Sequence, residues 1–276
     1  MEKGCIEQLH AWFETYTAGF YNGDSYVNAN IRFKHDHSLR TEAEIVGLAE
    51  ALNLDEDQKA VAQAIGLVHD VGRFEQFGVF RTFSDCVSVD HGWLGNQVLN
   101  QSGALANLDP HVQHLLCTAV LHHNKRHLPA HLSDPDLLYC RLVRDADKLD
   151  ILRSLIQACR TLRTDPEGFE LEMGLPDEPY CTPTIVEAVL HGLTVPYSDL
   201  RTFNDAILVQ LGWVYDVNLT PTFKRIRDRR LPEQILALLP DLPDVHRIGL
   251  QVLAYVDDRL AGEEASVAAS TAEPLQ

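Results

Sequence analysis

The sequence predicts an all-α protein, an irregular helical bundle whose helices do not repeat. Through most of the 276 residues, apolar side chains recur every three to four positions, as they do in helices with one buried face. Capping residues, mainly aspartates, stand directly before several of these segments. The clearest β-like run, residues 80–89, is short and interrupted by Ser84-Asp85. We therefore expect residues 80–89 to form a loop.

Helical segments are expected throughout the first 160 residues. They cover residues 1–27, residues 28–52, about 56–70, a segment after Asp90, a segment after Asp109-Pro110, and about 135–160. Asp55, Asp90 and Asp109 are expected N-caps, because a side-chain oxygen there accepts a hydrogen bond from a backbone N–H of the first turn. Pro110 supports the last of these caps, since proline is favoured at the first helical position.

The rest of the chain is expected to add helices to this core. Residues 164–183 are rich in proline, glycine and acidic side chains, which favours a loop. Helical periodicity then returns, so residues 161–261 are expected to contain additional helices that pack on the core. Residues 262–276 have little to bury, and we expect them to be a disordered tail.

The charge composition limits the partners that this chain can have. It contains 23 Lys plus Arg against 40 Asp plus Glu, a net charge of −17 with histidine neutral. Such a surface repels nucleic-acid backbones and anionic lipid, so we expect no bulk nucleic-acid partner and no membrane partner. The one strongly basic run, KRIRDRR at residues 224–230, is expected to be a solvated helix rather than a nucleic-acid contact.

The sequence also predicts the cellular compartment of the protein. The N-terminus lacks the pattern of a signal peptide, and no stretch reaches 18 uninterrupted apolar residues. The six cysteines are scattered, without a CxxC pair, which suits reduced thiols. We therefore expect a cytoplasmic protein. Apolar helices in the C-terminal third could pack on the core or on a second subunit, so a homo-oligomer stays open.

Histidines are concentrated in one part of the chain, where ten of the thirteen lie between His35 and His131. Together with aspartates in the same helical segments they provide a set of candidate metal ligands. These are His37, His69, Asp70, His91, His122, His123 and Asp147. Imidazole nitrogen and carboxylate oxygen together suit Mn, Fe, Ni or Zn rather than Ca. The histidine-rich segment therefore predicts a transition-metal site.

The adjacent pair His69-Asp70 is the most informative part of this set. Neighbouring residues in a helix point about 100° apart, so both cannot lie on one exposed face. Near a helix end, however, they can hold metal ions from one side, with the carboxylate bridging two ions. Gly72 is expected to allow the tight backbone exit that this placement needs.

Four segments together resemble the HD superfamily of metal-dependent phosphohydrolases. They are HSLRTEAEIVGLA, LVHDVGRF, a helix ending in HHN, and RDADKLDIL. The resemblance covers about residues 30–155 and implies an HD-type metal-binding core over residues 28–160. The family pattern H…HD…D falls on His37, His69-Asp70 and Asp147. Asp145 and, more weakly, Asp150 compete for the last position.

Two further histidines make the chain similar to the dinuclear subtype of this superfamily. His91 and His122 match the additional positions, and His123, beside the latter, stays open as a ligand. The resemblance implies two divalent ions, of Mn, Fe, Ni, Mg or Zn, bridged by Asp70. It assigns His37, His69 and Asp147 to one ion and the remaining histidines to the other. The nucleophile it implies is a metal-bound hydroxide.

The resemblance also implies a substrate class. It indicates cleavage of a phosphoester or phosphoanhydride bond in a small phosphorylated, nucleotide-like substrate, with Asp70 and Arg73 as catalytic residues. Arg73 is the first candidate to bind phosphoryl oxygens, followed by Lys125, Arg126 and Lys148. The chain has no GYP motif after HHN, which disfavours cyclic-di-GMP as the substrate. A di-iron oxygenase-type HD protein and a non-catalytic HD sensor or scaffold stay open as alternatives.

Overall fold

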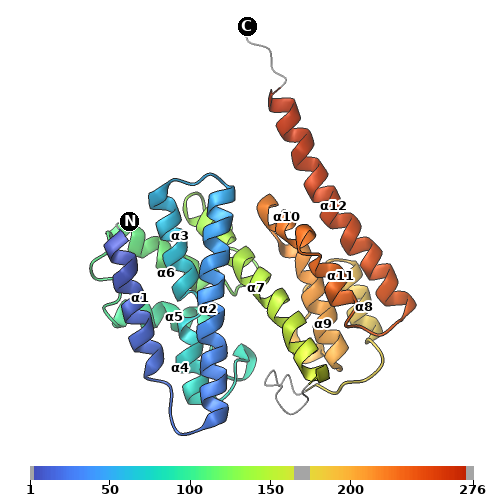
Figure 1. Ribbon diagram of the computed structural model, residues 1–276, viewed down its shortest axis with the longest axis horizontal. Coiled ribbons are helices and arrows are strands. Elements are labelled where there is room, and N and C mark those ends of the chain that lie inside the picture. The colour runs from blue at the N-terminus through green and yellow to red at the C-terminus, as the bar shows by residue number, and fades with distance from the viewer. Residues whose placement is uncertain (1–2, 165–174, 272–276) are drawn as a thin grey trace. The chain divides into compact units, whose positions relative to one another are not determined.

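The computed structural model describes residues 3–164 and 175–271. All regular elements within these ranges are helices, which confirms the prediction of an all-α fold (Figure 1). The chain divides into two compact units, Met1–Asp150 and Ile151–Gln276. The candidate metal ligands, from His37 to Asp147, all belong to the first unit.

The first unit contains the helices that carry the candidate ligands. Its elements are α1 (Lys3–Ala18), α2 (Ser25–Ala51), α3 (Glu56–Val68), α4 (Val71–Phe80), the short 3-10 helix η1 (Asp85–Val87), α5 (His91–Gln101), α6 (Pro110–His122) and the beginning of α7 (Asp136–Thr164). The single helix expected over residues 1–27 is wrong, because α1 ends at Ala18 and α2 begins after Asp24. Asp24 caps α2 by accepting from the backbone N–H of Tyr26 at 2.9 Å.

The expected N-caps are confirmed and explain where the helices start. Asp55 accepts from the backbone N–H of Gln58 at 2.8 Å, and the Gln58 side chain accepts from the Asp55 backbone, which completes a capping box. Asp90 caps α5 by accepting from the backbone N–H of Trp93, and Asp109 caps α6 by accepting from the backbone N–H of His111. Each such cap contributes about 1 kcal/mol to helix stability.

The core of the first unit forms where α2 packs along α3, α4 on α5, and α5 on α6. Ile31, Ile45 and Leu48 on α2 are completely buried, and burial of each such side chain contributes roughly 1.5–3 kcal/mol. Gly66 lets α3 approach α2 closely, since a Cβ there would lie 2.6 Å from Ile45 Cγ2 and 2.9 Å from Glu42 Cα. This close contact places the end of α3 beside the middle of α2.

The second unit contains the end of α7 and the helices that follow. These are α8 (Pro183–Leu190), the 3-10 helix η2 (Tyr197–Asp199), α9 (Phe203–Leu211), the 3-10 helix η3 (Gly212–Asp216), α10 (Thr220–Asp228), α11 (Leu231–Leu236) and α12 (Pro243–Thr271). Helix α12 packs against α8, α10 and α11. Its residues Ile248, Val252 and Val256 are completely buried.

Two sequence expectations fall partly outside the described residues. The loop expected at residues 164–183 includes residues 165–174, which the structure does not describe. In the tail expected to be disordered, α12 continues as a helix to Thr271, and residues 272–276 lie outside the described range. Alanine and glutamate are strong helix formers, which is consistent with this extension.

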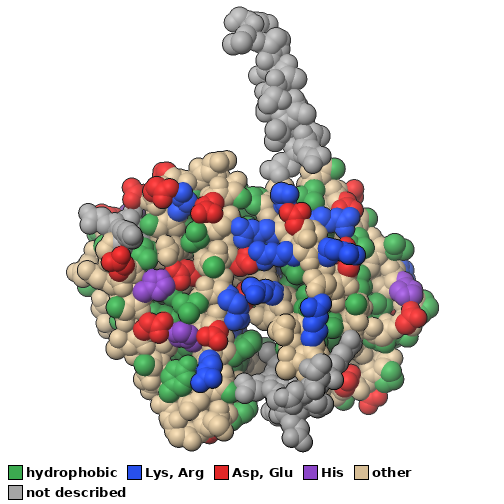
Figure 2. Space-filling view, viewed as in Figure 1, with side chains coloured by type: hydrophobic (Ala, Val, Ile, Leu, Met, Phe, Trp, Pro, Cys, Tyr) green, Lys and Arg blue, Asp and Glu red, His purple; other side chains and the backbone are tan. Residues whose placement is uncertain are grey.

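The basic run at residues 224–230 lies on α10 and just beyond it, where Lys and Arg side chains gather in the space-filling view (Figure 2). Lys224 pairs with Asp228 at 3.2 Å, and Arg227 pairs with Asp257 at 3.0 Å. These pairs with neighbouring acids match a solvated, charge-balanced helix. Across the described residues, no helix combines the length and apolar character needed to cross a membrane.

Candidate metal centre

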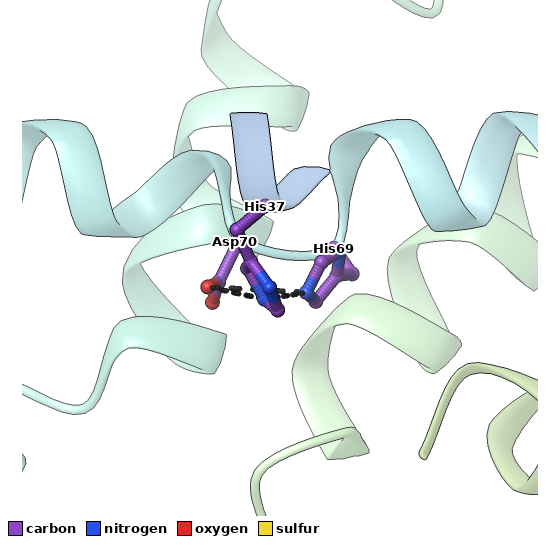
Figure 3. Close-up of side chains that lie close together, drawn as sticks. All are labelled: His37, His69 and Asp70. Carbon is purple, nitrogen blue, oxygen red and sulfur yellow. Dashed lines mark hydrogen bonds and ion pairs between the residues drawn. The ribbon is translucent and has the colours of Figure 1, made fainter. Parts of the chain in front are cut away.

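His69 and Asp70 form the junction between two helices. Helix α3 ends at Val68 and α4 begins at Val71, while Asp70 leaves helical geometry with φ −106° and ψ 16°. This break turns both side chains toward His37, which reaches the same point from α2 (Figure 3). The expectation that the pair lies at a helix end is therefore confirmed.

Gly72 has a different role from the one expected. It lies inside α4 and does not provide a left-handed turn. A Cβ at this position would lie 2.3 Å from the backbone oxygen of His91 and 2.5 Å from the backbone nitrogen of Gly95. Glycine is therefore needed for the close approach of α4 to α5, which brings His91 to Asp70.

Asp70 lies between two pairs of histidines. Its Oδ2 is 3.5 Å from His37 Nε2 and 3.8 Å from His69 Nε2. Its Oδ1 is 3.5 Å from both His91 Nε2 and His123 Nε2. The ligand atoms fall into two groups that share the carboxylate: His37, His69 and Asp70, and Asp70, His91 and His123. Each carboxylate oxygen thus faces its own pair of imidazole nitrogens.

The outer nitrogens of two rings are fixed by backbone carbonyls. His69 Nδ1 donates to the carbonyl oxygen of Gly66 at 2.8 Å, and His123 Nδ1 donates to that of Val120 at 2.7 Å. A carbonyl can only accept, so the neutral form of each ring carries its proton on Nδ1. Their Nε2 atoms are consequently lone-pair donors directed at Asp70.

Carboxylates fix the other two rings. His37 Nδ1 donates to Asp150 Oδ2 at 2.7 Å, and His91 Nδ1 donates to Asp85 Oδ2 at 2.7 Å. An outer carboxylate of this kind sets the tautomer and orientation of a metal-binding imidazole and raises its basicity. Burial, together with the charge of Arg73, lowers the pKa of His91 to about 3, so that ring is neutral near pH 7.

The inner nitrogens approach one another closely. His37 Nε2 lies 3.2 Å from His69 Nε2, and His91 Nε2 lies 3.0 Å from His123 Nε2. With the protons on Nδ1, the contact between His91 and His123 places two lone pairs against each other, which is unfavourable unless a cation lies beside them. All four rings and Asp70 are at most 5% exposed. The donor set therefore fits metal ions on both sides of Asp70.

The choice between three aspartates on α7 follows from helix geometry. Asp147 Oδ1 lies 3.1 Å from His37 Nε2 and 3.6 Å from His69 Nε2, so this carboxylate faces the first group. Asp150, one turn further, shares that face and holds the outer side of His37. Asp145 lies two positions before Asp147, about 200° around the helix, and is completely buried.

Helix geometry also decides which of His122 and His123 faces Asp70. Adjacent positions in a helix point about 100° apart, and His123 is the residue that belongs to the group around Asp70. His122 is half-buried, and its buried Nδ1 has no hydrogen-bond partner in the described part of the chain. The structure therefore places His123, rather than His122, beside His91.

The family comparison agrees with this geometry. Residues 35–152 match the family model described as HD domain. This part of the chain is an HD domain. Proteins with this domain are generally metal-dependent hydrolases. Comparisons with curated proteins and with solved structures gave no match.

The HD domain holds the four expected substrate-binding cations in different surroundings. Arg73 lies at the centre, where its Nε is 3.6 Å from Asp70 Oδ1. Lys125 forms an ion pair with Asp90, the N-cap of α5. Arg126 is exposed, and Lys148 is half-buried directly after Asp147. Of the predicted cations, Arg73 is the one that the structure places against Asp70.

Several polar residues of the HD domain could not be predicted from the sequence pattern. Asp85, at the start of η1 before α5, accepts from Arg73 at 3.1 Å and from Gln76 at 2.8 Å as well as from His91. These partners outweigh burial and hold the pKa of Asp85 below its usual range. Lys34 donates to Asp70 Oδ2 at 2.8 Å. The spacing of three residues between Lys34 and His37 could have revealed that they share a helix face.

Proposed function

We propose that this HD domain is a metal-dependent phosphohydrolase that holds two divalent ions on either side of Asp70. The observation that carries the proposal is the division of Asp70 between two pairs of imidazole nitrogens, at 3.5–3.8 Å on one oxygen and 3.5 Å on the other. A carboxylate placed in this manner is suited to bridge a pair of ions. The HD-domain match supports the same class of activity.

The proposed ligands form two sets that share Asp70. His37, His69 and Asp147 would complete one set, and His91 and His123 would complete the other. Mixed imidazole and carboxylate donors suit Mn, Fe, Ni or Zn, with Mg as an alternative ion for activity. When bound, two such ions supply positive charge to phosphoryl oxygens and lower the pKa of coordinated water.

Arg73 is the residue that we propose to stabilise the phosphoryl group. Its guanidinium is anchored through one terminal nitrogen, which donates to Gln76, to the carbonyl oxygen of Phe83 and to Asp85. Its buried Nε has no hydrogen-bond acceptor within the described residues. A preorganised cation of this kind favours the charge that develops on a transferring phosphoryl group. The substrate would be a small phosphorylated molecule, nucleotide-like in size.

A combined metal and activity measurement tests this proposal. The purified protein is stripped of metal, reloaded with Mn, Mg, Fe or Zn, and incubated with a panel of nucleotide monoesters, diesters and anhydrides. We expect phosphate or nucleotide release that depends on added metal and is reduced by at least about a hundredfold in Asp70→Ala, since removing one well-placed charge-stabilising group has such an effect. His122→Ala is the matched control and should remain active.

The same measurement separates the alternatives. Oxygen consumption with Fe and no release from any phosphorylated substrate would favour the oxygenase type. A protein that binds no divalent ion would contradict the catalytic proposal altogether.

A further inference from the structure

Lys34 is a nearly buried cation within the metal centre. It lies on α2, one turn before His37, and 11% of its side chain is exposed. Its Nζ donates to Asp70 Oδ2 at 2.8 Å. This is the oxygen that also faces His37 and His69, at 3.5 Å and 3.8 Å. Lys34 and an ion bound by those histidines would therefore share one carboxylate oxygen.

Sharing that oxygen has an electrostatic consequence. A divalent ion and an ammonium group on the same carboxylate repel each other, and the repulsion is strong because the surroundings are buried and weakly polarisable. Arg73 adds another positive charge at 3.6 Å from the other oxygen of Asp70. Asp70, Asp85, Asp147 and Asp150 supply four negative charges around the centre, fewer than the six positive charges that Lys34, Arg73 and two divalent ions would carry. An additional anion would relieve this excess.

Lys34 also has the capacity to bind such an anion. An ammonium group carries three N–H donors, and within the described residues Asp70 is its only hydrogen-bond acceptor. The ring of Phe83 lies 5.4 Å from Lys34 Nζ and 5.9 Å from Arg73 Cζ. An aromatic ring holds a cation in place without neutralising its charge. Phe83 thereby keeps both cations near Asp70 and available to an anion.

We propose that Lys34 is a substrate-binding residue of this centre. In the metal-loaded protein its ammonium group donates to an oxygen of the phosphate-bearing ligand, so that anion binding and metal binding strengthen each other. The proposal rests on the proposed function and deepens it. The competing role is structural: Lys34 only orients Asp70 for the metal ions.

Calorimetric titration of the metal-free full chain with Mn²⁺, with and without inorganic phosphate, separates these roles. We expect phosphate to strengthen Mn²⁺ binding to the wild type by at least about fivefold, which is at the lower end of typical coupling between ligands. In Lys34→Met, Mn²⁺ binding without phosphate should be equal or tighter because the repulsion is removed, while the strengthening by phosphate should fall to less than about twofold. Lys34→Arg should restore part of the coupling, and Lys59→Met is the control for removal of a lysine outside the centre.

Two results would overturn the proposal. One is a wild-type Mn²⁺ affinity that phosphate does not change. The other is Lys34→Met with Mn²⁺ affinity reduced at least about tenfold and the phosphate effect intact, which is the result expected for a residue that only orients Asp70. Lys34→Gln provides a second neutral variant if Lys34→Met does not fold. A substrate panel without turnover would refute the hydrolase and leave this coupling standing, so the two failures are distinguishable.

Discussion

Asp70 is a buried carboxylate that lies beside two cations, Lys34 and Arg73, as well as beside the imidazoles. Burial would raise its pKa, but Lys34, the neighbouring imidazoles and Arg73 outweigh burial and hold the pKa well below the usual 3.8. The carboxylate is therefore ionised near neutral pH. An ionised carboxylate with both oxygens directed at imidazole nitrogens is preorganised to bind cations.

The two adjacent histidines at the end of α6, His122 and His123, should respond differently to substitution. His123→Ala should lower the affinity for the second metal ion by at least about tenfold, because it removes a nitrogen that faces Asp70. His122→Ala should leave the metal content unchanged. Metal analysis by mass spectrometry after dialysis measures both variants. The reverse result would contradict the assignment of His123, rather than His122, as the ligand.

Residue types and their order in the sequence predicted candidate ligands that the structure brings together, but they did not decide every choice among neighbouring residues. The sequence identified His37, His69 and Asp70, yet it favoured His122 over the neighbouring His123. Which of two adjacent rings faces inward depends on the rotation of α6 about its axis, and packing against α5 and α3 sets that rotation. Lys34 was missed because its partner Asp70 is 36 positions away.

At the scale of elements, close packing between helices brings the ligands together. Helix α4 follows the His69-Asp70 junction and approaches α5 through Gly72, and α5 in turn carries His91 at its first residue. The sequence predicted the helices and their caps because these depend on local hydrogen bonds. It did not predict that Gly72 is needed for close helix packing, since the backbone atoms that exclude a Cβ there belong to another helix, α5.

Gly72→Ala tests this packing. The added methyl group would meet the His91 carbonyl oxygen at 2.3 Å, and backbone atoms cannot move aside as a flexible side chain can. We expect the free energy of unfolding to fall by about 1–3 kcal/mol and metal affinity to fall with it. Gly23→Ala, where a Cβ would meet nothing within 4 Å, is the matched control. Urea denaturation measures both variants, and equal stabilities would contradict the close approach of α4 to α5.

The N-cap of α5 gives a prediction about pH. Burial raises the pKa of Asp90, but Lys125, the backbone N–H of Trp93 and Asn124 outweigh it and lower that pKa to about 2. A carboxylate with a lowered pKa stabilises the folded state above its unfolded pKa of about 4, and this contribution disappears as the pH falls toward 2. Asp90→Asn should therefore be less stable than the wild type at pH 7, by less than about 1 kcal/mol because the site is partly exposed.

Thermal melting of both proteins across pH 2–7 checks this expectation. The difference between wild type and Asp90→Asn should shrink as the pH falls. A difference that is constant over the range would show that the charge of Asp90 makes no contribution.

At the scale of the whole molecule, the candidate metal centre lies within one of the two compact units. Ligands from α2, the α3–α4 junction, α5, the end of α6 and α7 all belong to residues 1–150. The net charge of −17 disfavours long polyanions, whereas Lys34, Arg73 and the proposed metal ions make the centre locally cationic. We therefore expect a protein of this composition to bind a small phosphorylated molecule and to repel nucleic acid.

Removal of metal should affect the first unit selectively. Ions present at a hundred times their dissociation constant stabilise the folded state by about 2.7 kcal/mol. Hydrogen exchange after chelation should therefore become faster in α2, α3 and α6, and remain unchanged in α9 and α10, which carry no ligand. Equal acceleration in both sets would contradict a centre confined to residues 37–147.

The central claim is that Asp70 bridges two metal ions, and anomalous diffraction from crystals soaked in Mn²⁺ tests it most directly. We expect two anomalous peaks, one on each side of the Asp70 carboxylate, about 3.5–4 Å apart as in other two-metal sites. One peak should lie near His37, His69 and Asp147, and the other near His91 and His123. A single peak confined to one side of Asp70, or no peak at this residue, would contradict the bridging role of Asp70.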